Sequence, residues 1–283
     1  MLRRSECVII AYLIWAAGVA AAMPVRPPVR PVTLVLNLTI LACYALLAYA
    51  DSLRRRPLLG IVRDWFPFPL LLLAYREMGW FALPSPGHAL ETRWVVWDRY
   101  VLGGGGRAAI ELLGPLVPSL LEIAYSLVYV LGPFSVAMLY AYRRRERVDR
   151  FLFVFTLGVL LCYAQFPFWP SEPPRTVFPG RDFPSYDTVF RRFNWWMLGG
   201  YGIHTSVFPS AHVAGAFAAA LGMWIALPER RWVSRFLFVM AVLIATATVY
   251  GRYHYLADAA TGLVMAVLAL VLTRALAIYR KQV

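Results

Sequence analysis

Long apolar runs alternate with short polar segments along the whole chain. Several of the runs reach about the 20 residues that a helix needs to cross the hydrocarbon core of a bilayer. The pattern therefore predicts an all-α fold, a polytopic transmembrane helical bundle with about eight spans. The predicted spans are residues 7–23, 33–50, 65–83, 119–142, 151–167, 207–227, 235–251 and 256–278.

Composition agrees with a membrane protein. The chain is 60% hydrophobic and 15% charged, and its mean hydropathy is +0.61, well outside the range of a soluble domain. The formal net charge of +13 raises the question of nucleic acid as a partner. The arginines form short runs between apolar segments, which is typical of cytoplasmic loops and contacts with anionic lipids, so we expect no nucleic acid partner.

The basic runs also predict an orientation. Eight spans place all of them on one side, which the positive-inside rule assigns to the cytoplasm, with both termini there. We therefore expect an integral protein of the bacterial inner (plasma) membrane whose outer loops face the periplasm or outside. The runs are Arg3-Arg4, Arg54-Arg55-Arg56, Arg143-Arg144-Arg145, Arg230-Arg231 and Arg280-Lys281.

Two of the predicted outer segments are long. Residues 84–118 contain four consecutive glycines at 103–106, but no Gly-Lys-Ser/Thr follows them, so they indicate a flexible turn into an interfacial helix rather than a phosphate-binding loop. Residues 168–206 are rich in proline, arginine and aromatic residues, which suits a loop in the headgroup layer. The acidic residues Glu77 and Glu122 lie in or near apolar spans, where a charge must be paired or interfacial.

His254 and Asp258 are the strongest candidates for chemistry. They are four residues apart after Gly251, which predicts a turn followed by the first helical turn of the last span. On a helix, that spacing lets the carboxylate accept one imidazole N–H and leaves the other ring nitrogen free as a nucleophile or base. The bland alternative is a polar pair that stabilises a helix end.

Two further polar pieces belong to the same predicted face. Ser210 is a natural N-cap, and the unpaired N–H groups of the helix that follows it would point at an anion beside His212. Arg175 follows two prolines at the outer end of the fifth span, where its guanidinium could bind a phosphate with two hydrogen bonds or contact a lipid headgroup. His204 and Tyr250 are additional candidates for the pocket, although a surface position and core packing explain them as well.

These motifs resemble the type 2 phosphatidic acid phosphatase superfamily, which includes the vanadium-dependent haloperoxidases. Pro209-Ser210-Ala211-His212 is similar to its Pro-Ser-Gly-His motif, with Ala211 in place of glycine. His254 and Asp258 match the histidine and aspartate of its third motif in type and spacing. The style of the motifs looks closest to the branch that contains the inositol phosphorylceramide synthases.

The chain departs from the family pattern in its cations. Lys281 is the only lysine, and Phe168 stands seven residues before Arg175, where the family has a lysine. Ala247-Thr248 replaces the Ser-Arg pair of the third motif, and the nearest arginine is Arg252. Phosphate charge must therefore be held differently here.

The resemblance implies a membrane phosphatase or phosphotransferase with a six-helix core, acting on a lipid phosphate or phosphodiester through a phosphohistidine. Catalysis would use His254, His212 and Asp258, and the phosphate would contact Arg175, Arg252, Ser210 and Ala211. No metal and no cofactor are required, and the partners are the lipid substrate and membrane lipids. Residues 1–118 would form N-terminal helices and a linker, and residues 119–283 the catalytic core.

Three alternatives remain at this stage. The first is transfer of inositol phosphate or another headgroup between lipids, in place of hydrolysis. The second is a zinc hydrolase built on His212, His254, Asp258 and His204, although their spacing matches no common zinc motif. The third is a transporter or scaffold without enzymatic activity, in which the polar residues line a path through the membrane. The sequence indicates no oligomeric state.

Overall fold

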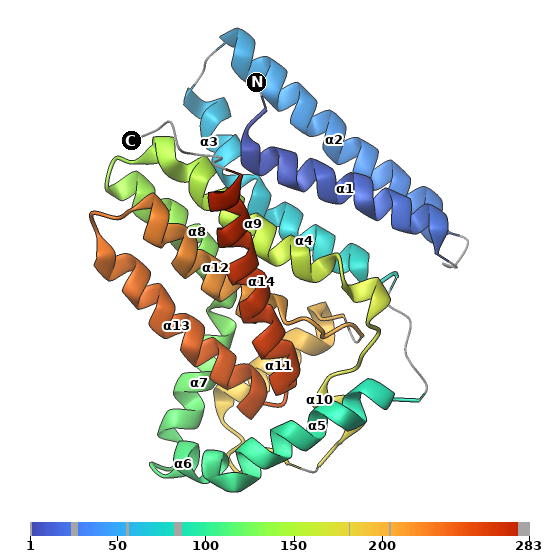
Figure 1. Cartoon of the computed structure of the whole chain (residues 1–283), viewed down its shortest axis with the longest axis vertical. Helices are drawn as coiled ribbons and strands as arrows, with labels where there is room; N and C mark the ends of the chain where they lie inside the picture. Colours follow the sequence, from blue (N-terminus) through green and yellow to red (C-terminus); the bar gives the residue numbers. More distant parts are fainter. Residues whose placement is uncertain are drawn as a thin grey trace.

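The computed structural model describes residues 2–23, 28–54, 57–81, 87–180, 182–203 and 205–276, and every regular element in them is helical, which confirms the predicted all-α fold. Figure 1 shows the longer helices packed side by side. The helices are α1 (Arg4–Ala22), α2 (Val29–Arg54), α3 (Pro57–Trp65), α4 (Pro67–Met78), α5 (Ala89–Val101), α6 (Arg107–Glu111), α7 (Leu116–Ser126), α8 (Val128–Ala141), α9 (Val148–Tyr163), α10 (Pro174–Val177), α11 (Val189–Tyr201), α12 (Ala211–Ala226), α13 (Arg231–Tyr250) and α14 (Leu256–Ala275).

Within the described residues, six helical stretches are long and apolar enough to cross a membrane, and a pair bent by 106° at residues 89–126 would be a seventh. α8 and α12 are apolar but shorter. The predicted number of eight therefore stays a prediction. The third stretch starts at Pro57 rather than at residue 65, because the charged Arg63 and Asp64 are buried in ion pairs and do not end the helix.

α12 lies at the centre of the bundle, in contact with α8, α9, α13 and α14. Its alanines and glycines let the neighbouring backbones approach closely. A Cβ at Gly262 of α14 would stand 2.4 Å from the carbonyl oxygen of Ser210, and one at Gly158 of α9 would stand 2.9 Å from Ala218 Cβ. The first turn of α12 is thereby fixed against α14.

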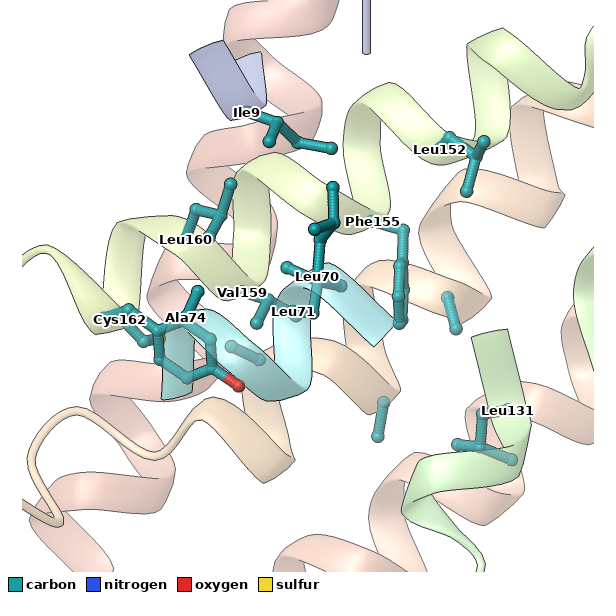
Figure 2. Packing of buried hydrophobic residues seen from close by; sticks show 14 of the residues in the cluster. Ile9, Leu70, Leu71, Ala74, Leu131, Leu152, Phe155, Val159, Leu160 and Cys162 are labelled. Atoms are coloured by element: carbon teal, nitrogen blue, oxygen red, sulfur yellow. The ribbon is translucent and has the colours of Figure 1, made fainter. Parts of the chain in front are cut away.

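The N-terminal helices pack on α9. Leu70, Leu71 and Ala74 of α4 lie against Val159 and Leu160 of α9, in the apolar cluster that Figure 2 shows from close by. α1 contacts α2 and α9. The N-terminal helices and the later helices therefore share one continuous apolar core.

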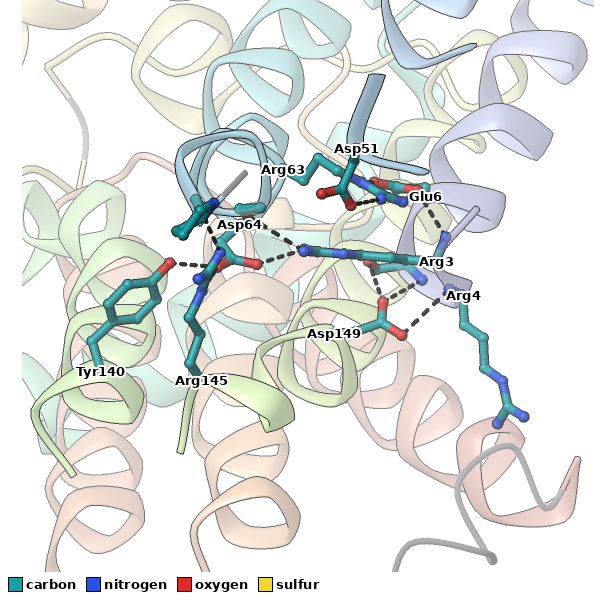
Figure 3. A network of polar contacts seen from close by, with 12 residues as sticks. Arg3, Arg4, Glu6, Asp51, Arg63, Asp64, Tyr140, Arg145 and Asp149 are labelled. Atoms are coloured by element: carbon teal, nitrogen blue, oxygen red, sulfur yellow. Dashed lines mark hydrogen bonds and ion pairs between the residues drawn. The ribbon is translucent and has the colours of Figure 1, made fainter. Parts of the chain in front are cut away.

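A network of ion pairs joins α1, α2 and α3 to α8, α9 and the turn between them (Figure 3). Arg63 donates to Glu6 and to Asp51 at 2.7 and 2.6 Å. Arg3 donates to Asp64 at 2.5 Å. We refer to this group as the inner network: Arg3, Glu6, Asp51, Arg63, Asp64, Tyr140, Arg145 and Asp149.

The short helices α5, α6, α10 and α11 gather at the other end of the bundle, the lower end of Figure 1. α5 contacts α10 and α14, and α11 contacts α7. The four glycines form the predicted turn between α5 and α6, where Gly105 has φ +110°. These helices surround the turn between α13 and α14, which carries His254.

Candidate active site

The loop between α13 and α14 presents His254. α13 ends at Tyr250, and Gly251 caps it as predicted. The N–H groups of Tyr253 and His254 both donate to the carbonyl of Thr248, at 2.9 and 3.0 Å. The turn is therefore tight, and the His254 side chain is buried.

The predicted placement of His254 in the first turn of the last helix is wrong. α14 begins at Leu256 with Tyr255 as its N-cap, so only Asp258 lies in the first turn. Asp258 Oδ2 accepts the Tyr255 N–H at 2.8 Å, and this bond caps the helix. The sequence pattern does not reveal this cap, because tyrosine is not among the residues that usually cap a helix.

The surroundings of the His254 ring assign its proton. Nδ1 lies 3.1 Å from the carbonyl oxygen of Val207 and 3.4 Å from Asp258 Oδ2. Both neighbours are hydrogen-bond acceptors, so Nδ1 carries the hydrogen and Nε2 keeps its lone pair. Asp258 lies near the ring as predicted, but the hydrogen bond of Nδ1 goes to the carbonyl of Val207, an orienting contact that sequence reasoning did not find.

His212 faces the lone pair of His254. Its Nδ1 lies 3.4 Å from His254 Nε2, and its Nε2 lies 3.3 Å from the Tyr129 hydroxyl. The ring also stacks on Tyr125 at a centroid distance of 5.1 Å. A single set of tautomers satisfies these contacts: Tyr129 donates to His212, and His212 donates to His254.

Ser210 begins α12 as predicted. Its hydroxyl accepts the Val213 N–H at 3.4 Å, and its own N–H donates to the carbonyl of Asp258 at 3.0 Å. Ala211 and His212 are thus the first residues of a helix whose N-terminus points toward the site. The free N–H groups and the positive end of the helix dipole favour an anion there.

Arg175 lies beside the two histidines. It comes from α10, its guanidinium donates to the carbonyl of Tyr253 at 3.3 Å, and it lies over the Tyr253 ring at 5.8 Å. A cavity of about 30 Å³ adjoins these groups. The cavity is lined by Tyr75, Tyr125, Phe166, Arg175, Leu198, Ile203, Ser206, Val207, Ala211, His212, Tyr253 and His254. Among these residues, Arg175 is the cation beside the histidines.

Burial is the main electrostatic influence on His254. Loss of water lowers its pKa well below the ordinary 6.5, and the nearby His212 and Arg175 lower it further. The bond to Val207 acts in the opposite direction. His254 is therefore neutral at pH 7, which is the form that a nucleophile requires.

Arg252 and Tyr250 lie away from the cavity. Arg252 is fully buried at φ +64°, and its guanidinium donates to Asp98 of α5 at 2.6 Å. The Tyr250 hydroxyl donates to Glu111 at 2.9 Å. Neither side chain lines the cavity that holds Arg175 and the histidines. His204 lies outside the described residues.

A second polar network holds the turn that carries His254 in place. Asp98 binds Arg252 and also accepts the Leu256 N–H at 2.8 Å. Glu122 accepts the Tyr253 hydroxyl at 2.5 Å, and it is paired, as its position in an apolar segment predicts. We refer to this group as the outer network: Asp98, Glu122, Arg191, Asn194, Arg252 and Tyr253.

Sequence reasoning missed Asp98 as a partner of Arg252, because 154 positions separate them. The available signal was Asp98 itself, an acid in the predicted outer segment 84–118, because an acid that becomes buried needs a cation as its partner. In the part of the chain that the structure describes, no three side chains of histidine, cysteine, aspartate or glutamate converge as metal ligands.

Comparison with known proteins agrees with the motifs. The family model of the PAP2 superfamily matches residues 109–272. A PA-phosphatase related-family protein of Dictyostelium discoideum is 26% identical over 171 residues, which are 52% of this chain and 30% of that protein. The chain thus spans less than a third of that relative. The crystal structure of Aquifex aeolicus LpxE aligns with a TM-score of 0.44 and 20% identity, covering 59% of this chain and 93% of that one.

Proposed function

Because the chain belongs to the PAP2 superfamily, we propose that it is an integral-membrane lipid phosphatase that works through a phosphohistidine at His254. One observation carries the proposal. The Nε2 lone pair of His254 faces a cavity that also holds His212 and Arg175, while Nδ1 is bonded on the other side. This arrangement combines a nucleophile, an acid and a cation in one small space.

The first step breaks the ester bond of the substrate. His254 Nε2 attacks phosphorus, and the bond between phosphorus and the lipid oxygen breaks. His212 enters this step as the imidazolium, having taken a proton from the substrate phosphate monoanion, and it gives its Nδ1 proton to the leaving oxygen, which leaves His212 neutral with its hydrogen on Nε2. His254 becomes a cationic phosphohistidine whose Nδ1–H is held by Val207 and Asp258. The phosphoryl group displaces the direct contact of 3.4 Å between the two histidines.

The second step regenerates the enzyme. His212, now without its Nδ1 proton, takes a proton from water as the water oxygen attacks phosphorus. The bond between phosphorus and His254 breaks, and inorganic phosphate leaves. A lipid hydroxyl in place of water would give a phosphotransferase with the same residues, and the products distinguish the two. We propose hydrolysis.

The phosphate charge is held without the lysine that the family resemblance would supply. Arg175 and the N–H groups of Ala211 and His212 at the start of α12 are the donors that we assign to the phosphate, because all three residues line the cavity beside His254. Arg252 is bound to Asp98, so we propose that it positions the catalytic turn rather than the phosphate. The orientation with the site toward the periplasm or outside remains a prediction.

The experiment is phosphate release from phosphatidate and other lipid phosphates by the purified protein in detergent. His254→Ala should lower the rate by at least ~10³-fold, because the nucleophile is lost. His88→Ala is the matched control, since His88 is half-buried away from the cavity and near Glu91. Full activity in His254→Ala would overturn the nucleophile assignment, and absence of phosphate release by the wild type would overturn the proposed function.

A further inference from the structure

A second cavity lies directly beside the catalytic one. It has a volume of about 120 Å³ and lies between α4, α8, α9 and α12. Tyr75, Ala211 and His212 line both cavities. The remaining walls are almost entirely apolar, and include Phe68, Leu71, Leu72, Phe155, Val159 and Gly215.

α4 supplies one wall of this apolar cavity. Phe68, Leu71, Leu72 and Tyr75 all belong to α4 (Pro67–Met78). Figure 2 shows Leu71 beside Phe155 and Val159 of α9, which form the facing wall. The match to the family covers residues 109–272, so this wall comes from a part of the chain that precedes the matched region.

The outer end of α4 is also tied to the segment that leads into the Pro-Ser-Ala-His motif. The Tyr75 hydroxyl accepts the Ile203 N–H at 2.9 Å, and Arg76 donates to the carbonyl of Tyr201 at 2.7 Å. A Cβ at Gly79 would stand 2.6 Å from Ile203 Cγ2. These contacts fix the position of α4 relative to His212.

The cavity opens at the side of the bundle. Leu72 is 51% exposed and Tyr129 is 43% exposed, while Leu71 and Val159 are buried. Leu72 lies in one of the stretches that are long and apolar enough to cross a membrane. An exposed apolar side chain on such a stretch faces lipid, so the opening faces the hydrocarbon of the bilayer.

We propose that this cavity binds the hydrocarbon chain of the phosphate ester, and that α4 is the wall that selects for it. The inference rests on the proposed function. A phosphoryl group at His254 has its ester oxygen next to His212, and His212 lines the apolar cavity. The first carbons beyond that oxygen therefore enter an apolar space rather than water.

The experiment uses n-alkyl phosphates from butyl to octyl as soluble substrates. In the wild type, kcat/KM should rise by at least ~10-fold from butyl to octyl phosphate, because the added methylene groups are buried in the cavity. Leu72→Trp should fill the opening and remove this rise, so that its kcat/KM for octyl phosphate is no higher than its kcat/KM for butyl phosphate. The readout is the ratio of the two kcat/KM values within one variant, which a general loss of activity leaves unchanged.

Leu38→Trp is the matched control. Leu38 is an exposed leucine of α2 outside the cavity, and its variant should keep the full dependence on chain length. Leu72→Ala, which widens the opening, should reduce the rise without abolishing it. A wild type with no dependence on chain length, or a Leu72→Trp protein that keeps it, would overturn the inference. If the wild type hydrolyses none of the alkyl phosphates, that result contradicts the proposed function instead.

Discussion

The inner and outer networks use the same residue types at opposite ends of the bundle, but one stabilises contacts between helices and the other stabilises a turn. In the inner network, Arg63 bridges Glu6 and Asp51 and thereby joins α1, α2 and α3 through side chains. In the outer network, Asp98 binds a backbone N–H of α14 and the side chain of Arg252 in the catalytic turn. The inner network docks helices, and the outer network fixes a turn.

The two networks also differ in how completely their cations are bonded. Arg252 is fully buried, yet its Nε and Nη2 have no hydrogen-bond partner. A buried charge with unused donors costs stability, so the outer network is not optimised for stability alone. From this difference we infer that the outer ion pairs serve the position of His254, and the variants below test this.

Removal of Asp98 should have the largest effect. Asp98→Ala leaves the buried Arg252 guanidinium unpaired and the Leu256 N–H without an acceptor. We expect a loss of ~3–5 kcal/mol in the free energy of unfolding, measured by denaturation in detergent, together with loss of phosphate release.

The control for Asp98 is another aspartate that pairs with an arginine. Asp182 pairs with Arg99 of α5 at 2.9 Å, and both side chains are partly exposed. Asp182 has φ +64°, which asparagine tolerates better than alanine, so the control is Asp182→Asn, which should cost less than ~1 kcal/mol. Equal losses in the two variants would show that burial of the Arg252 pair has no special importance.

Weakening the inner network should reduce stability without reducing the rate. Glu6→Gln removes the charged partner of Arg63 but leaves Asp51 in place. We expect a loss of ~1.5–3 kcal/mol in the free energy of unfolding and a kcat within about two-fold of the wild type. A fall in kcat comparable to that of Asp98→Ala would contradict the division between the two networks.

Two tyrosines allow the sharpest comparison. Tyr253 donates its hydroxyl to Glu122 of the outer network, and Tyr140 donates to Asp64 of the inner network. Replacement of each by phenylalanine should cost a similar ~1–3 kcal/mol. Only Tyr253→Phe should also lower kcat, by several-fold, because Tyr253 precedes His254. Equal kcat values in the two variants would remove the distinction.

The smallest expected change is in the position of the pH profile, separate from any loss of rate. Protonation of His254 would remove the proposed nucleophile, and burial lowers its pKa well below 6.5, so the acidic limb of kcat/KM should lie below pH 6.5. Arg175→Gln removes one influence that lowers this pKa. The acidic limb of the kcat/KM profile should therefore move to higher pH, and a limb that stays in place would contradict the assignment.

The candidate site residues were easier to predict than the contacts that hold them. His254, His212 and Arg175 were predicted from local motifs, because spacing and capping act within a few residues, and the structure places them beside one cavity. The bond from His254 to Val207 and the pair between Asp98 and Arg252 join segments 47 and 154 residues apart. Such contacts depend on how the helices pack, and a single sequence does not contain that packing.

The fold shows the same limit. Hydrophobic runs predicted the helices, since each run reflects local burial in lipid or protein. They placed the start of the third span too late, because the buried pairs of Arg63 and Asp64 are supplied by distant helices. The cavity wall formed by α4 was not predicted for the same reason.

Rapid acid quench of the reacting enzyme, followed by mass spectrometry under conditions that preserve phosphohistidine, tests the central claim most directly. During turnover of a lipid phosphate, the account predicts a phosphoryl group on His254, with none on His212 and none in a His254→Ala protein. A phosphoryl group on His212 would contradict the account. Turnover by a His212→Ala protein without any phosphorylated histidine would also contradict it, because a slower second step should let the phosphohistidine accumulate.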